Sequence, residues 1–167
     1  FYSAAQENSS GEYAAGNVKS VWFEKDGSRL AYPFLQLDSP EEIVLHFDIL
    51  GGEAGSLWYR LEHCDREWNS SDLFTSDFLE GYEENQITDY LPSFNTKTSY
   101  THYSLRLPNE DAKLKLSGNY IITVWAPGAP DTPLLKKRFF VTEGTSSADV
   151  IFRRPMKPGT TETHQQL

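Results

Sequence analysis

Residues 116–122 read Leu116-Ser117-Gly118-Asn119-Tyr120-Ile121-Ile122 and give the most specific indication of a fold in this chain. A glycine two residues before a tyrosine, at the start of an apolar strand, is the layout of the tyrosine corner of immunoglobulin-like sandwiches. In that motif the tyrosine hydroxyl ties the preceding turn to the strand. The stretch therefore predicts an antiparallel β-sandwich in which Gly118 and Tyr120 have structural roles.

The rest of the sequence favours an all-β fold, because apolar and polar residues alternate with a period of two and no convincing helix is found. The clearest run is 42–50, which places Ile43, Leu45, Phe47 and Ile49 on one face. The strands that we expect cover residues 18–23, 31–37, 42–50, 56–64, 87–94, 99–107, 119–125 and 134–142. Their spacing predicts an immunoglobulin-like antiparallel β-sandwich of about seven to nine strands.

Two of these strands carry signs of an edge position. Pro33 has no backbone N–H to give to a neighbouring strand, so we expect the strand at 31–37 at an edge. Lys136, Lys137 and Arg138 suit a charged, solvent-facing edge, which resists pairing with other chains. The last strand, 134–142, is therefore also predicted at an edge.

The length of 167 residues suits one domain with an additional segment. We expect a disordered leader at 1–16, because small polar residues dominate there. The sandwich domain is expected at 17–144. Residues 145–167 change to Gly, Ser, Thr and Pro, which predicts a linker and the start of a truncated following domain.

Composition excludes several classes of function. The formal net charge is −9 and the isoelectric point is near 4.9. Binding to nucleic acid or to anionic lipid needs a basic face, so neither partner is expected. No apolar run approaches the roughly 20 residues that span a bilayer, so direct membrane insertion is not expected. Cys64 is the single cysteine, which leaves neither an intrachain disulfide nor a zinc site of several cysteines.

The segment HCDREWNSSD, residues 63–72, has the composition of a metal or catalytic centre. If the strand runs through Cys64, however, His63 and Cys64 project to opposite faces of the sheet and cannot bind one metal without a bulge. We expect His63 to be half-buried at the strand end and Cys64 to be a small packed side chain. The chain shows no glycine-rich phosphate loop and no serine or zinc protease motif, so it is predicted not to be an enzyme and to need no cofactor or metal.

Residues 62–90 carry nine acidic side chains against one base, Arg66, and they also hold several aromatic side chains. Four interpretations stay open: a calcium site, a carboxylate pair for glycoside hydrolysis, a loop packed on the sandwich, and a docking surface. The residues that we expect to bind a partner are Trp68, Glu80, Tyr82, Glu83, Glu84 and Asp89. Surface tryptophans, among them Trp58, Trp68 and Trp125, offer an alternative function as a glycan-binding sandwich.

Two resemblances follow from ordered motifs. The run Tyr59-Arg60-Leu61-Glu62 with Asp65 and Trp68, followed by 116–120, resembles small sandwich modules of bacterial sensor proteins, which implies structural roles for Tyr59 and Trp68. A more specific set of stretches resembles the first domain of the type IX secretion system plug proteins of Bacteroidetes. The stretches that carry it are Val18–Leu37, Tyr59–Ser70, Phe78–Thr96, Tyr100–Tyr120 and Thr161–Gln166.

The second resemblance implies a non-enzymatic component that is exported to the periplasm and associated with the outer membrane. The family is similar to the protein that closes the periplasmic mouth of the outer-membrane translocon barrel while no substrate passes. The implied partners are this barrel or another envelope protein, and the remaining domain of the same chain. The resemblance supplies no functional site residues.

Overall fold

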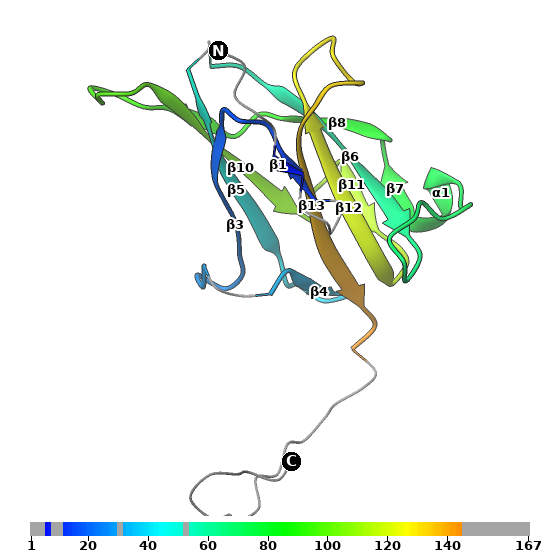
Figure 1. Ribbon diagram of the computed structural model, residues 1–167. Coiled ribbons are helices and arrows are strands. Elements are labelled where there is room, and N and C mark those ends of the chain that lie inside the picture. Colours follow the sequence, from blue (N-terminus) through cyan, green and yellow to red (C-terminus); the bar gives the residue numbers. More distant parts are fainter. Residues whose placement is uncertain (1–5, 8–11, 30–31, 52–53, 145–167) are drawn as a thin grey trace, which may run out of the picture.

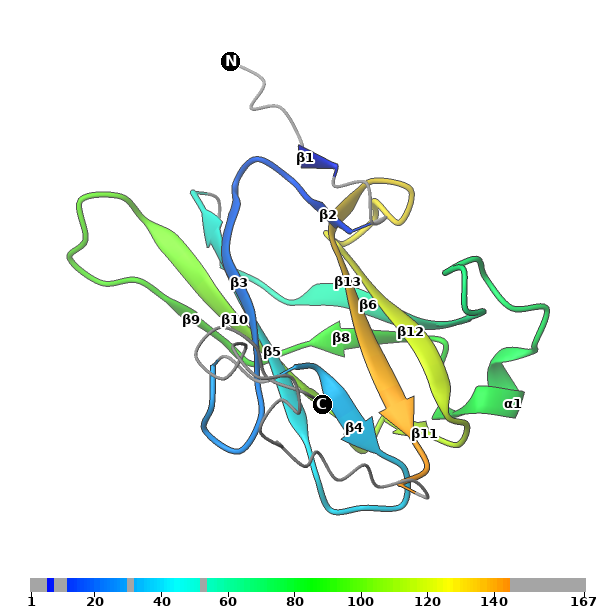
Figure 2. The same ribbon diagram turned by 60° about the horizontal axis from the view of Figure 1, so that its bottom comes forward.

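The structure is a computed structural model that describes residues 6–7, 12–29, 32–51 and 54–144. The expected linker at 145–167 and most of the expected leader lie outside these residues. The described chain forms two antiparallel sheets that face each other (Figures 1 and 2), which confirms the predicted all-β sandwich.

The larger sheet has seven strands in the order β1-β2-β13-β12-β6-β8, with β4 also paired to β13. All its pairings are antiparallel except that of β4, which runs parallel to β13. Its strands are β1 (Gln6–Glu7), β2 (Tyr13–Ala14), β4 (Phe34–Gln36), β6 (Leu57–Cys64), β8 (Glu84–Ile87), β12 (Gly118–Trp125) and β13 (Pro133–Thr142).

The second sheet has four strands in the order β3-β5-β10-β9. A two-stranded ribbon, β11-β7, and one short helix, α1, complete the described chain. The bounds are β3 (Val18–Glu24), β5 (Ile43–Leu50), β10 (Tyr100–Leu107), β9 (Tyr90–Pro92), β7 (Leu79–Gly81), β11 (Ala112–Leu114) and α1 (Thr75–Phe78).

The core lies between the two sheets, where the alternation of each strand directs its apolar residues. Phe47 and Tyr103 are cross-strand partners in the four-stranded sheet, and their rings stack at 5.2 Å. In the larger sheet Tyr120 and Phe139 stack in the same way at 5.2 Å. All four rings are buried, so aromatic pairs supply much of the apolar area that stabilises the sandwich.

The last strand is not an edge strand, which corrects the prediction from its basic residues. β13 lies between β12 on one side and β2 and β4 on the other. Lys137 is neutralised by Glu12, with 2.8 Å between Nζ and Oε1. The alternation of a strand indicates its faces but not its neighbours, so the sequence could not show that residues near position 13 return to this strand.

Three other elements differ from the sequence prediction. The strand expected at 87–94 is two short strands, β8 and β9, which belong to different sheets because the chain crosses between the sheets at residues 88–89. The leader expected at 1–16 contains β1 and β2, which pair with each other and extend the larger sheet from β13. The helix α1 was not expected because four residues are too few to show helical periodicity. In contrast, β4 pairs only with β13 in the described chain, as Pro33 predicts.

Candidate docking surface

The most exposed part of the acidic region is the segment 73–84, which we call the docking loop. It contains α1 and β7 and projects at the end of the molecule opposite the β9–β10 hairpin (Figure 1). Phe74 and Tyr82 are 79% and 72% exposed, and Leu73 is 41% exposed. The side chains of Asp77, Glu80, Glu83 and Glu84 are also exposed, so the loop presents apolar rings among carboxylates.

The docking loop is anchored to the sandwich at its centre. Phe78 is 5% exposed, and its ring contacts those of His63 and Tyr120 with centroids 5.8 and 6.0 Å apart. The Lys115 N–H donates to the Phe78 carbonyl at 2.9 Å, and Lys115 Nζ donates to the Ser76 carbonyl at 2.7 Å. The exposed rings are therefore held on a fixed support and are not carried by an unattached loop.

Both ends of the loop are also held in place. The carboxylate of Asp77 accepts a 3.0 Å hydrogen bond from the N–H of Phe74, which closes the first turn of α1. At the other end, Gly81 has φ of 135°, and an added Cβ would overlap the backbone carbonyl of Asp111. Only glycine allows β7 to approach β11 this closely.

The six residues expected to bind a partner do not form one site. Glu80, Tyr82, Glu83 and Glu84 lie together on the docking loop and the start of β8. Trp68 is half-buried elsewhere, with the Arg138 guanidinium 4.1 Å from its ring centroid and the Phe140 ring at 5.3 Å. Asp89 lines a pocket on the outer face of the four-stranded sheet. Four of the six residues therefore remain candidates for one surface. Trp68 and Asp89 are close to them in sequence but lie elsewhere in the fold.

A pocket of about 310 Å³ lies between β6 and the docking loop, and His63, Leu73 and Glu83 are among its lining residues. His63 Nε2 is 3.3 Å from the Ser117 carbonyl, which only accepts, so Nε2 carries the proton. His63 Nδ1 then accepts the hydroxyl hydrogen of Ser71 at 2.9 Å. Both ring nitrogens of His63 thus have partners, in the segment after β6 and in the turn before β12, while the ring itself packs on Phe78 of the docking loop.

Cys64 has no reactive character. Its side chain is 3% exposed, and burial together with the nearby Glu62 and Asp65 carboxylates raises the pKa of the thiol to about 11. A thiol with such a pKa is largely protonated at neutral pH and is therefore a poor nucleophile. Among the described residues, no group of three or more His, Cys, Asp or Glu side chains is arranged to hold a metal ion.

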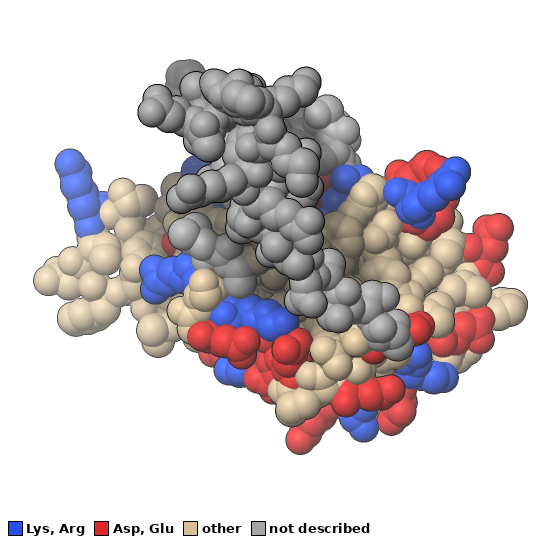
Figure 3. All heavy atoms as spheres, turned by 90° about the horizontal axis from the view of Figure 1, so that it is seen from below, with Lys and Arg blue, Asp and Glu red and all other residues tan. Residues whose placement is uncertain are grey.

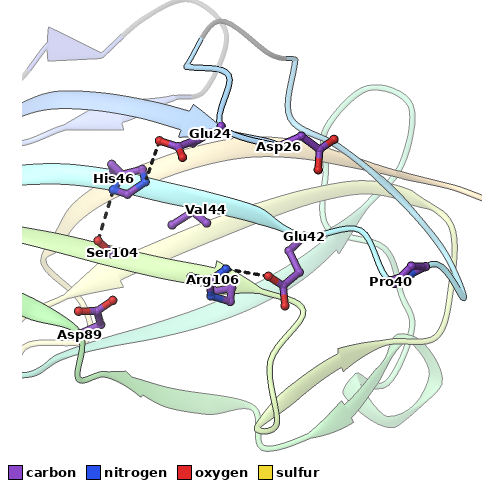
Figure 4. Close-up of a pocket in the computed structure, with 10 residues that line it drawn as sticks. Glu24, Asp26, Pro40, Glu42, Val44, His46, Asp89, Ser104 and Arg106 are labelled. Carbon is purple, nitrogen blue, oxygen red and sulfur yellow. Dashed lines mark hydrogen bonds and ion pairs between the residues drawn. The ribbon is translucent and has the colours of Figure 1, made fainter.

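A second pocket, of about 340 Å³, lies on the outer face of the four-stranded sheet (Figure 4). Acidic side chains line it together with His46, Ser104 and Arg106. Arg106 Nη1 is 2.7 Å from the Glu42 carboxylate, and His46 Nε2 is 3.6 Å from the Glu24 carboxylate. The acidic residues are Glu24, Asp26, Glu42 and Asp89.

Beside this pocket His46 and His102 form a pair that the sequence analysis missed. His46 Nδ1 is 3.1 Å from His102 Nε2, and His102 Nδ1 is 2.7 Å from the Asp48 carboxylate. Both imidazoles lie against the Trp22 ring, at 5.1 and 5.7 Å. Burial lowers the pKa of His46, and the neighbouring His102 charge lowers it further. The available signal was that Trp22, His46 and His102 occupy outward-facing positions of three strands, β3, β5 and β10. The sequence does not show that these strands are adjacent.

Trp58, Trp68 and Trp125 do not form one platform for a sugar. Trp125 is 3% exposed and pairs in register with Trp58. Trp68 contacts Phe140, which lies opposite Asn119 of β12. Asn119 is six residues from Trp125 along the same strand, a distance of about 20 Å. The described arrangement does not favour the glycan-binding alternative.

The β9–β10 hairpin presents a second group of exposed apolar side chains. Leu91 is 71% exposed and Phe94 is 94% exposed, while the Ser93 N–H donates to the Tyr100 carbonyl at 2.8 Å and keeps the hairpin closed. Viewed from below, this projecting end at the left carries few acidic side chains, whereas acidic and basic side chains are interspersed over the rest of the visible surface (Figure 3). The described part of the sandwich therefore exposes apolar side chains at two opposite ends, the docking loop and the β9–β10 hairpin.

None of the helices in the described residues has the length and hydropathy needed to cross a membrane.

Comparison with curated proteins gives no match to this chain. A solved structure of a hypothetical protein from Parabacteroides merdae ATCC 43184 matches with 32% identity and a TM-score of 0.74. The match covers 78% of this chain and 33% of that protein, so the chain spans about a third of the length of its relative.

A family model described as the first domain of the type 9 secretion system plug protein matches residues 18–143. This range contains both sheets except β1 and β2, together with the docking loop and the two pockets. It also confirms the family that the sequence motifs indicated. The chain belongs to the family of type 9 secretion system plug proteins and contains their first domain.

Proposed function

We propose that this chain is a non-enzymatic periplasmic docking domain that helps to seal the outer-membrane translocon of the type 9 secretion system. The observation that carries the proposal is the family match over residues 18–143. A rigid sandwich suits this role, because a pore wide enough for folded cargo leaks unless a folded domain occupies its mouth. Reversible closure favours a moderate contact area with polar as well as apolar contacts.

We further propose that the docking loop contacts the translocon barrel or the next domain of the same protein. Phe74 and Tyr82 are exposed aromatic rings on an anchored support, and such rings are the usual anchors of protein interfaces. The surrounding carboxylates of Glu80, Glu83 and Glu84 give the loop a negative potential that steers it toward a basic partner surface.

Affinity purification of the full-length protein from its native envelope tests both statements. Recovery of a very large outer-membrane barrel with the wild-type protein supports the sealing role, and recovery of soluble partners alone contradicts it. The charge-reversed variant Glu80→Lys, Glu83→Lys, Glu84→Lys is expected to lose this recovery. A matched variant, Glu42→Lys, Glu67→Lys, Asp131→Lys, changes the net charge equally at exposed positions outside the loop and is expected to retain it.

If both triple variants recover the barrel equally well, the docking loop is not the contact surface, although the sealing role itself survives. If both lose it equally, net charge alone accounts for the effect and the loop assignment fails.

A further inference from the structure

An open groove of about 610 Å³ lies on the side of the sandwich where β3 and the segment leading to β4 meet β13. Figures 1 and 2 show β4 between β5 and β13 at one end of this side, where it pairs with β13. We call this feature the cationic groove. The residues that characterise it are Trp22, Arg29, Tyr32, Trp68, Arg138 and Phe140.

Two guanidinium groups in the groove lie over tryptophan rings. The Arg29 guanidinium lies 5.3 Å from the Trp22 centroid, and that of Arg138 lies 4.1 Å from the Trp68 centroid. Stacking on an indole fixes the plane of a guanidinium while its N–H edge still points away from the ring. Each guanidinium is therefore held close to the face of an indole ring.

Neither of these guanidinium groups forms an ion pair with a carboxylate of the described residues. Arg66 and Arg106, in contrast, are paired with Glu67 and Glu42. In addition, Arg138 Nε is shielded from solvent and has no acceptor among the described residues, and the same holds for Trp22 Nε1. Buried donors are nearly always satisfied in folded proteins, so the described residues leave the polar groups of these two lining residues incompletely satisfied.

The groove already binds one carboxylate. Glu12 Oε1 accepts hydrogen bonds from Lys137 Nζ at 2.8 Å and from the backbone N–H of Arg138 at 3.3 Å. Lys137 and Arg138 belong to the part of β13 that pairs with neither β2 nor β4. Glu12 thus shows which ligand chemistry this surface accepts.

We propose that the cationic groove binds an acidic segment of a partner polypeptide. The carboxylates of the segment form charge-assisted hydrogen bonds with Arg29 and Arg138, and its apolar side chains pack on Tyr32 and Phe140. Charge complementarity supports this occupant, because three described lining residues are cationic and one is acidic, while the whole chain carries a net charge of −9. The groove is separate from the docking loop, and the proposal does not rest on the proposed function.

Tryptophan fluorescence of the 167-residue chain tests the proposal, because two of its four tryptophans line the groove. The probe is a peptide of alternating glutamate and leucine with blocked ends, and its glutamine–leucine counterpart serves as the neutral control. We expect saturable binding of the acidic peptide that weakens with salt. Arg29→Gln and Arg138→Gln are each expected to weaken it about tenfold, by analogy with other charge-assisted contacts.

Arg60→Gln is the matched control variant. Arg60 also lies over a tryptophan ring, 5.8 Å from the Trp125 centroid, but it does not line the groove, so the variant is expected to bind like the wild type. Equal binding of the neutral peptide overturns the proposal, and so does equal loss in all three variants or no binding at all. Inorganic polyphosphate that binds as tightly as the acidic peptide overturns it as well, because the site would then recognise anions in general.

Discussion

The hydroxyl of Tyr120 donates a 2.7 Å hydrogen bond to the carbonyl oxygen of Leu116, four residues earlier in the chain. Tyr120 is completely buried, and burial raises the pKa of its hydroxyl. Its ring stacks on Phe139 and contacts the rings of His63 and Phe78. One side chain thus joins the turn before β12, the core and the anchor of the docking loop.

Tyr120→Phe is expected to lower the free energy of unfolding by about 1–3 kcal/mol, because the partly buried Leu116 carbonyl loses its donor while the ring stays in place. Urea unfolding monitored by fluorescence measures the change. Tyr82→Phe is the control: its side chain is 72% exposed, so we expect less than about 0.5 kcal/mol. Equal effects of the two substitutions would show that the Tyr120 hydroxyl contributes nothing specific.

Gly118→Ala is expected to be more destabilising than Gly128→Ala. Both glycines have positive φ, at 145° and 76°, but a Cβ at Gly128 meets nothing within 4 Å, whereas one at Gly118 would overlap His63 Nε2. The Gly128 variant has only the backbone cost of about 1–2 kcal/mol. The Gly118 variant also displaces the imidazole that joins β6 to the docking loop, for a total of about 3 kcal/mol or more. Unfolding midpoints in urea that coincide for the two variants would contradict this account.

The sequence predicted the sandwich well because the alternation of apolar and polar residues in each long strand indicates which of its side chains are buried. In β5 the residues expected on one face include Ile43, Leu45 and Phe47, and all three are fully buried. Adjacency was not predictable, since it depends on contacts between distant segments. The pairing of β13 with β2 and β4, and the contact of His46 with His102, join strands more than 50 residues apart. The same limit explains why Trp68, which is near the docking loop in sequence, packs instead against Arg138 and Phe140 of β13.

His46 is expected to make the protein less stable as the pH falls. Its pKa in the folded state lies below the ordinary value of 6.5, so the unfolded chain binds more protons near and below that pH. The charged or titratable groups that face it are Glu24, Arg29, Asp89 and His102. Stability contributed by the neutral imidazole is therefore complete above about pH 7.5, begins to fall near pH 6.5 and is lost as the pH falls through the lowered pKa of the folded state.

Urea midpoints measured from about pH 8 to pH 5.5 test this dependence, because most carboxylates stay ionised over that range. His46→Gln removes one of the titrating groups and is expected to flatten the curve. A curve for this variant as steep as that of the wild type would assign the pH dependence to other groups.

Cys64 is expected to resist thiol reagents in the folded protein. Its side chain is 3% exposed and the pKa of its thiol is about 11, so both access and the thiolate fraction are small at pH 8. Reaction with an aromatic disulfide reagent should be at least about 100-fold slower than in denaturant, where one thiol per chain reacts promptly. Comparable rates in the two conditions would mean that the strand end at Cys64 opens readily.

The exposed rings of the docking loop are expected to serve binding and not stability. Phe74 and Tyr82 are 79% and 72% exposed, so Phe74→Ser with Tyr82→Ser removes little buried apolar area and should change the free energy of unfolding by less than about 0.5 kcal/mol. The same double variant of the full-length protein should recover far less translocon from the envelope, because aromatic anchors carry a large share of interface energy. Phe94→Ser, at a 94% exposed position on the hairpin, is the matched control and should leave recovery unchanged. If the hairpin variant alone loses the translocon, the contact surface lies at that end of the sandwich and the docking loop must be reassigned.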